Sequence, residues 1–232
     1  MVRKRKRVLG TYTATVFVED ISTSMQAPGR IDAINAMKPK MLQALSNLSV
    51  GVRYAEVNFG SDACVVQDFD DVPNVTPQQY AADGGNTNLS AGVAVALDLL
   101  EGQKEYFKKN QIPHRQPVLI VASDGEANRE TVPGYDARVR ELVERNKLTV
   151  IPIAVGELGA YPVLEWISPK CTPVMVNTNN AASVDWDDLL QLLSQSIDTG
   201  STEAIQALAA SQARQVGLDG ADEELVEEEV AP

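Results

Sequence analysis

The chain has 232 residues, a formal net charge of −12 at pH 7 and 44% hydrophobic residues, which is enough to bury the core of one α/β domain without a metal or a disulfide. Its two cysteines, Cys64 and Cys171, belong to no CxxC or Cys/His spacing, which argues against a structural zinc site or a disulfide framework and favours a reducing cytoplasm. No apolar run approaches the length needed to span a bilayer, so we expect a soluble, cytoplasmic protein.

Charge is concentrated at the two ends of the chain. Five consecutive bases run from Arg3 to Arg7, and residues 219–232 hold seven acids and no base. A basic run can touch nucleic acid or anionic lipid, but it is more often a solvated flank, so we expect neither a nucleic-acid nor a membrane partner. We predict a basic flank over 1–9, one domain over 10–199 and a weakly helical, then disordered acidic tail over 200–232.

Segments of strand character alternate with segments of helix character between the two ends. In chain order the sequence predicts a strand at 11–19, a helix at 30–48 and a two-stranded hairpin at 50–60 and 63–69. A helix follows from within 83–92 to about 108, then a strand at 117–125 and a helix at 134–146. A strand at 148–156, a short helix at 161–167, a strand at 173–177 and a last helix at 186–197 complete the series. Pro39 predicts a kink or a break in the first helix, and Pro152 predicts an edge or a bulge in its strand.

The order of these elements predicts the fold class. The hairpin supplies one antiparallel edge, and the continuous apolar run 117–125 is typical of a central parallel strand that is covered on both faces. We therefore expect an α/β fold with a doubly wound, mostly parallel central sheet, one antiparallel edge strand and helices on both faces.

Three short segments follow a predicted strand or open a helix, and each carries oxygen-bearing side chains. Asp20, Ser22 and Ser24 alternate directly after the first strand, Thr87 precedes a helix, and Asp124 follows the central apolar strand. Loops beyond the carboxyl ends of strands in an open α/β sheet gather in one crevice, so we expect these side chains to converge. A simpler interpretation is that the hydroxyls only cap helices and that Asp124 belongs to an ordinary turn.

The chemistry of these five groups favours a metal site. All are hard oxygen donors and no His or Cys joins them, which suits Mg²⁺, with Mn²⁺ or Ca²⁺ as alternatives, rather than zinc. Three of the five are neutral, so a bound dication would stay electrophilic and could accept a carboxylate from another molecule. The single histidine, His114, lies in a connecting loop, which leaves no Ser–His triad and no predicted catalytic residue.

The order Asp20-x-Ser22-x-Ser24, then Thr87, then Asp124 resembles the metal-ion-dependent adhesion site (MIDAS) of von Willebrand factor A (VWA) domains. The resemblance implies a VWA/Rossmann-like fold. It also implies that the three hydroxyls contact the ion directly or nearly so, and that the two carboxylates hold it partly through water.

The resemblance covers about residues 10–198 and, within the family, points to the bacterial TerY-like group of tellurium-resistance and stress operons, partly through the segment LLQLLSQSI (189–197). It implies an adaptor or scaffold that docks an Asp or Glu of a protein partner through the bound cation, beside a kinase or phosphatase of the same system. One departure is Thr23, which stands where the family usually has glycine; a β-branched residue resists positive φ and stiffens the loop.

A second hypothesis is a Mg²⁺-dependent phosphohydrolase of the haloacid-dehalogenase type. Those enzymes also place an Asp at the end of the first strand and a later Asp on the metal. Their nucleophile motif resembles Asp-x-Asp, but the second position here is Ser22, so the general acid is missing. The sequence favours a binding module over an enzyme.

Overall fold

The computed structural model describes residues 10–125, 134–156 and 186–199, with short stretches between 164 and 176 and between 201 and 211. Its centre is a six-stranded sheet in the order β3-β2-β1-β4-β5-β6, in which only the β2–β3 pair is antiparallel. The strands are β1 (Tyr12–Asp20), β2 (Gly51–Phe59), β3 (Ala63–Asp71), β4 (Val118–Ser123), β5 (Thr149–Val155) and β6 (Val174–Val176). The mostly parallel sheet with one antiparallel edge strand is confirmed.

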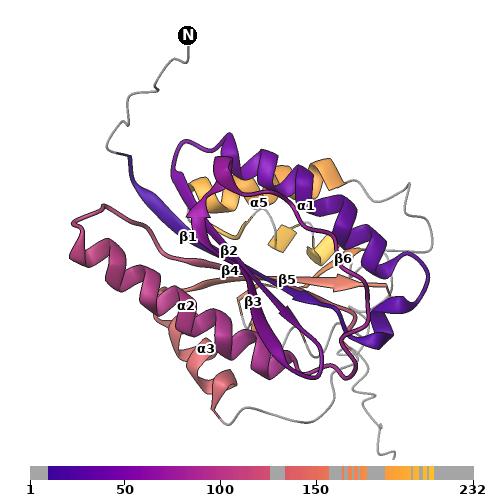
Figure 1. The fold of residues 1–232 in the computed structure, drawn as a ribbon. Coiled ribbons are helices and arrows are strands. Elements are labelled where there is room, and N and C mark those ends of the chain that lie inside the picture. The colour runs from indigo at the N-terminus through magenta and orange to yellow at the C-terminus, as the bar shows by residue number, and fades with distance from the viewer. Residues whose placement is uncertain are drawn as a thin grey trace, which may run out of the picture.

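Helices cover both faces of this sheet, as Figure 1 shows. On one face lie α1 (Arg30–Ser46) and α5 (Trp186–Thr199), and on the other lie α2 (Leu89–Lys109) and α3 (Tyr135–Glu144). Two short 3₁₀ helices, η1 (Thr23–Gln26) and η2 (Val72–Asn74), lie in the connections. Alternate residues of β1 belong to two apolar clusters, one on each face of the sheet. Phe17 packs toward α1, while Val16 and Val18 pack toward α2.

The break that Pro39 predicts in the first helix is absent, because α1 is continuous from Arg30 to Ser46. Pro39 lies on the exposed side of the helix, where water can satisfy the carbonyl that loses its helical donor. The opposite side buries Met37 and Met41 against the sheet, and this packing holds the two halves of the helix in line.

The bulge that Pro152 predicts is absent, and the edge that it predicts exists only locally, at the proline. Pro152 lies in an inner strand and pairs in regular register with Val121 of β4. β6 pairs with β5 only from Ile153 onward. Among the described residues, β5 therefore has a strand neighbour on one side only at the proline, and an edge is where a sheet tolerates proline.

Some predictions fall outside the described residues. These are the basic flank 1–9, the acidic residues 219–232 and most of the short helix expected over 161–167. The division into flank, domain and tail stays a prediction. None of the helices in the described part of the chain combines the length and the hydropathy of a membrane span.

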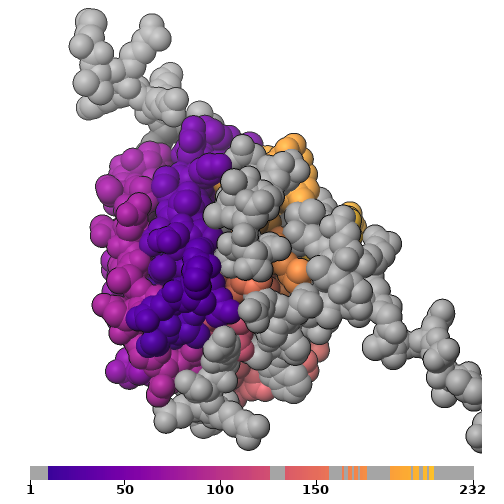
Figure 2. Space-filling view, turned by 90° about the vertical axis from the view of Figure 1, so that its right-hand side faces the viewer, coloured from indigo at the N-terminus to yellow at the C-terminus, as the bar shows by residue number. Residues whose placement is uncertain are grey.

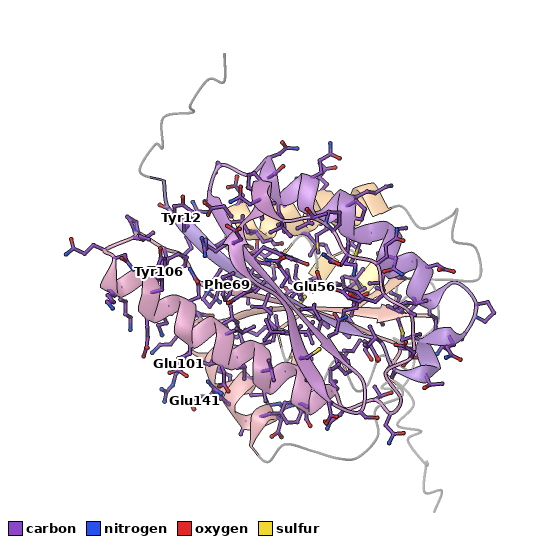
Figure 3. The ribbon with its side chains drawn as sticks, viewed as in Figure 1. Tyr12, Glu56, Phe69, Glu101, Tyr106 and Glu141 are labelled. Atoms are coloured by element: carbon purple, nitrogen blue, oxygen red, sulfur yellow. The ribbon has the colours of Figure 1, made fainter. Side chains whose placement is uncertain are left out.

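A group of buried charges joins α1 to the sheet. Lys38 of α1 donates hydrogen bonds to Glu19 Oε2 at 2.8 Å and to Glu56 Oε1 at 3.2 Å. Tyr54 also donates to Glu56, at 3.0 Å, and Figure 3 shows Glu56 in the middle of the molecule. Glu19 is fully buried and its Oε1 has no hydrogen-bond partner. Burial therefore raises the pKa of Glu19 to about 8.

The free energy of unfolding is expected to fall as the pH rises from about 5 to about 8. A carboxyl whose pKa is raised from 4.5 to about 8 holds its proton in the folded chain and has lost it in the unfolded chain. The stability that it contributes is complete below pH 4.5 and is lost as the pH passes the folded value. Glu19→Gln has no such proton, so its stability should depend less on pH in urea unfolding across this range.

The matched control is Glu101→Gln, because the Glu101 side chain is 67% exposed on α2 (Figure 3). This variant should keep the pH slope of the parent chain. A slope that Glu19→Gln leaves unchanged would contradict the prediction.

Candidate metal centre

Asp20 is the last residue of β1, and its side chain is fully buried. Its Oδ1 accepts a hydrogen bond from Ser22 N at 2.8 Å, and its Oδ2 accepts one from Ser123 Oγ, at the end of β4, at 2.6 Å. Burial is the main cause that raises the pKa of Asp20 to about 6; the charge of Asp124 also raises it, whereas the hydrogen bonds from Ser123 and Ser22 lower it. The carboxylate is thus fixed between two strand ends, with lone pairs left on both oxygens.

Ser22 and Ser24 place two hydroxyls side by side in the loop after β1, with their Oγ atoms 3.0 Å apart. Ser22 has the N-cap position of η1, but its side chain makes no capping hydrogen bond, and the N-cap of α1 is Gly29. Two neighbouring oxygen ligands of an octahedral Mg²⁺ ion, each about 2.1 Å from it, lie about 3.0 Å apart. The two hydroxyls therefore form a hydrogen bond with each other at a spacing that also fits adjacent ligands of one ion, and Ser22 makes no capping bond.

The loop that ends at Thr87 is held against the loop after β1 by backbone hydrogen bonds. Two of these, both 2.8 Å long, join residues 21–23 to residues 84–85. Thr87 is buried, and the N-cap of α2 is the next residue, Asn88, whose side chain makes the capping bond. Thr87 is therefore not the cap of α2, and it lies beside the loop that carries the serines.

Asp124 directly follows β4 and is 3% exposed. Arg30, the first residue of α1, donates from Nη1 to Asp124 Oδ2 at 2.7 Å and to the backbone oxygen of Ser24 at 3.3 Å. The sequence did not single out Arg30. The available signal was a base in the first turn of a helix, where the helix dipole disfavours positive charge.

The predicted residues therefore meet at one end of the sheet, beyond the carboxyl ends of its parallel strands. Figure 2 views the molecule from the side toward which the parallel strands point in Figure 1, and indigo atoms, which are of low residue number, run down this face. Hydrogen bonds connect Asp20 to Ser22 and to the neighbour of Asp124, and Arg30 connects Asp124 to Ser24. Thr87 is brought to the same place through its backbone neighbours.

The donor set fits a hard divalent cation. Within the described ranges, no group of three or more His, Cys, Asp or Glu side chains could hold a metal ion, so an ion here depends on hydroxyls as well as the two carboxylates. Thr23 begins η1, and the described non-glycine residues with positive φ are Gln111 and Asn146. Thr23 thus adopts no positive φ, and its β-branched side chain causes no backbone strain in this loop.

Comparison with known proteins places this arrangement in a family. The model of the von Willebrand factor type A domain matches residues 15–195. No curated protein matches the sequence. Among solved structures, proximal thread matrix protein 1 (PTMP1) from the mussel byssus is 17% identical with a TM-score of 0.58, over 80% of this chain and 47% of that one. Another PTMP1 structure, 19% identical over 80% of this chain and 46% of that one with a TM-score of 0.56, is described as having a zinc-occupied MIDAS motif.

Two bacterial proteins have similar structures. BatB from Bacteroides thetaiotaomicron is 15% identical with a TM-score of 0.55, over 82% of this chain and all of that one. The pilus adhesin SpaC from Lactobacillus rhamnosus GG is 13% identical with a TM-score of 0.60, over 84% of this chain and 31% of that one. This chain spans less than half the length of PTMP1 and about a third of SpaC. At these identities the likeness shows a shared fold.

Gly60, which follows β2, lies close to Gly84 in the loop that ends at Thr87, and this close approach generates a prediction. A Cβ atom on Gly60 would lie 2.2 Å from the backbone oxygen of Gly84, so Gly60→Ala is expected to push the two loops apart and to lower the free energy of unfolding by about 1–3 kcal/mol. The control is Gly102→Ala in α2, where no atom lies within 4 Å of the new Cβ. It should raise stability by about 0.5–1 kcal/mol. Urea unfolding measures both, and equal stabilities would contradict the prediction.

Proposed function

This chain belongs to the von Willebrand factor type A domain family, and on that premise we propose that it is a metal-dependent binding module, which captures a protein partner through a divalent cation at Asp20, Ser22, Ser24, Thr87 and Asp124. The observation that carries the proposal is the pair of serine hydroxyls, which lie 3.0 Å apart beside a buried carboxylate. That spacing fits two adjacent ligands of one ion. The Ser22 hydroxyl does not cap the helix that follows it.

The identity of the ion follows from the donors. Hydroxyl and carboxylate oxygens are hard ligands, so we propose Mg²⁺, with Mn²⁺ and Ca²⁺ as alternatives. A PTMP1 structure has zinc in its MIDAS motif, so titrations of this chain with metal ions should include Zn²⁺.

The partner would supply a carboxylate. The protein offers the ion two carboxylates and three neutral hydroxyls, and this set leaves room in a six-ligand shell for an outside group. An Asp or Glu side chain is a hard, anionic oxygen donor and so suits that position. The role proposed for the chain is therefore adaptor or scaffold, with the ion as the bridge.

A narrower form of the proposal concerns the biological setting. The sequence resemblance to the TerY-like group suggests a cytoplasmic, bacterial stress-response or tellurium-resistance system, with a kinase or phosphatase as the partner. This narrower form depends on the sequence resemblance alone. The similar structures include a pilus adhesin, so the shared fold does not select a compartment.

The geometry gives the phosphohydrolase hypothesis no support. The nucleophile of such an enzyme would be Asp20, but its side chain is fully buried and both of its oxygens already accept hydrogen bonds. The neighbouring position that would hold the general acid is Ser22, which cannot donate a proton as a carboxylic acid does. A binding role fits these contacts better than attack on a phosphate ester.

Ion binding is expected to depend on the two hydroxyls after β1. Ser22→Ala combined with Ser24→Ala removes two ligands and should weaken Mg²⁺ or Mn²⁺ binding by about tenfold or more in calorimetric titration. The matched control is Ser46→Ala combined with Ser49→Ala, because both serines are away from the site, at the far end of α1. Equal ion affinity in the two double variants would contradict the metal centre.

Partner capture is expected to require the ion. The full chain, immobilised, should retain its partner from a cell extract in Mg²⁺ and release it in EDTA, with mass spectrometry identifying what is released. The Ser22→Ala/Ser24→Ala variant should capture little in either buffer, while the Ser46→Ala/Ser49→Ala variant should behave as the parent chain. Capture that persists undiminished in the chelator would rule out an ion bridge.

A further inference from the structure

Arg30 is a buried cation inside the candidate metal centre. Its guanidinium lies 2.7 Å from Asp124 Oδ2, and the two side chains are 8% and 0% exposed. The same nitrogen donates to the backbone oxygen of Ser24 at 3.3 Å. Arg30 thus links the loop after β1 to the loop after β4, which are two of the loops that a bound ion would link.

The position of Arg30 is unfavourable for the helix that carries it. Arg30 is the first residue of α1, where the helix dipole favours acids and disfavours bases. The end of β5 nevertheless makes room for the side chain, since a Cβ atom on Gly156 would lie 2.7 Å from Arg30 Nε. Helix formation does not explain the arginine, whereas neutralisation of Asp124 does.

Charge makes Arg30 a competitor of the metal. Asp20 and Asp124 are the two carboxylates of the centre, and the three hydroxyls are neutral, so Arg30 cancels half of the negative charge that would attract a dication. A bound ion and the guanidinium would both draw on Asp124, and each repels the other. The ion must therefore displace or tolerate the arginine.

We propose that Arg30 is a built-in cation that occupies Asp124 when no metal is bound, so that a divalent ion enters the site in competition with it. This inference rests on the proposed function and adds a means of regulation: Arg30 keeps ion affinity low enough for the ion to be gained and lost. A change that moves the guanidinium away from Asp124 would let a divalent ion bind there, and loss of the ion would restore the Arg30–Asp124 ion pair.

The test measures ion affinity in the full-length chain, with MnCl₂ and MgCl₂ as the probes. Arg30→Met keeps much of the length of the side chain and removes its charge. An arginine beside a carboxylate lowers its affinity for a proton by about 10- to 1,000-fold, and a dication is repelled at least as strongly. Arg30→Met should therefore bind Mn²⁺ about tenfold or more tightly than the parent, and Arg30→Lys should stay near the parent value.

The matched control is Arg53→Met. Arg53 is also partly buried and paired with a carboxylate, Asp71, at 3.8 Å, but it lies beside Tyr106 at the opposite end of the sheet (Figure 3). Arg53→Met should leave ion affinity unchanged. Thermal unfolding separates the two effects, because added Mn²⁺ should raise the melting temperature of Arg30→Met more than that of the parent or of Arg53→Met.

A second measurement uses the parent chain, in case Arg30→Met fails to fold. The Nε–H resonance of Arg30, identified by its absence from the spectrum of Arg30→Lys, should shift when MgCl₂ is added, while that of Arg53 should not. A resonance that stays in place at saturating ion would overturn the competition.

The results separate this inference from the proposed function. If parent and Arg30→Met bind the ion with equal affinity, the metal centre stands and the role of Arg30 is overturned. Weaker binding by folded Arg30→Met also overturns it, because Arg30 would then help to build the site. If neither chain binds an ion, the proposed function fails and the inference fails with it.

Discussion

Two carboxylates buried at one end of the sheet are the constraint on which the site depends. Asp20 and Asp124 are 0% and 3% exposed, and the charge of Asp124 is one of the causes that raise the pKa of Asp20. Burial of like charges is costly unless hydrogen bonds or a cation offset it. Asp20 accepts hydrogen bonds from Ser22 and Ser123, and the guanidinium of Arg30 neutralises Asp124. Ser123 at the end of β4 holds Asp20, and Arg30 at the start of α1 holds Asp124, so each carboxylate fixes its own loop to a different element.

α1 carries two buried cations, Arg30 and Lys38. Arg30 faces Asp124, and two turns further on Lys38 faces Glu19 and Glu56. Buried ion pairs add little net stability compared with apolar contacts, but loss of one partner is expensive. Their effect here is on register: a sliding or rotation of α1 would break all three contacts among these five buried groups. The helix is therefore fixed against the strand that ends in Asp20, and the metal loop is fixed with it.

The sequence predicted the sheet, which the structure confirms, and the candidate site, which stays a prediction; it missed the charged residues that hold the two together. Alternation and the short connection after Gly60 were enough for the β2–β3 hairpin, and the alternate spacing of Asp20, Ser22 and Ser24 was enough for the candidate ligands. Arg30 and Lys38 were missed because periodicity marks apolar residues as buried and charged ones as exposed, whereas here the charges are buried in pairs from distant elements. The break expected at Pro39 and the bulge expected at Pro152 were wrong for a related reason, since local chemistry does not reveal which side of a helix or strand has no neighbour.

A fold shared at 13–17% identity with a mussel byssus protein and bacterial pilus proteins leaves function to the chemistry of the site. The net charge of the site depends on whether an ion is bound. Without an ion, Asp20, Asp124 and Arg30 leave one net negative charge, which attracts a cation. A divalent ion that takes Asp124 from Arg30 neutralises the two carboxylates and releases the guanidinium, which α1 still carries beside them. The ion and these three groups then have one net positive charge, which attracts an anion. Ion binding would thus reverse the net charge of these groups, and a partner carboxylate would be attracted only after the ion has entered. On the proposed function, this order of events follows from Arg30 as much as from the metal ligands, because without the arginine the loaded site would be neutral and the pull on a carboxylate weaker.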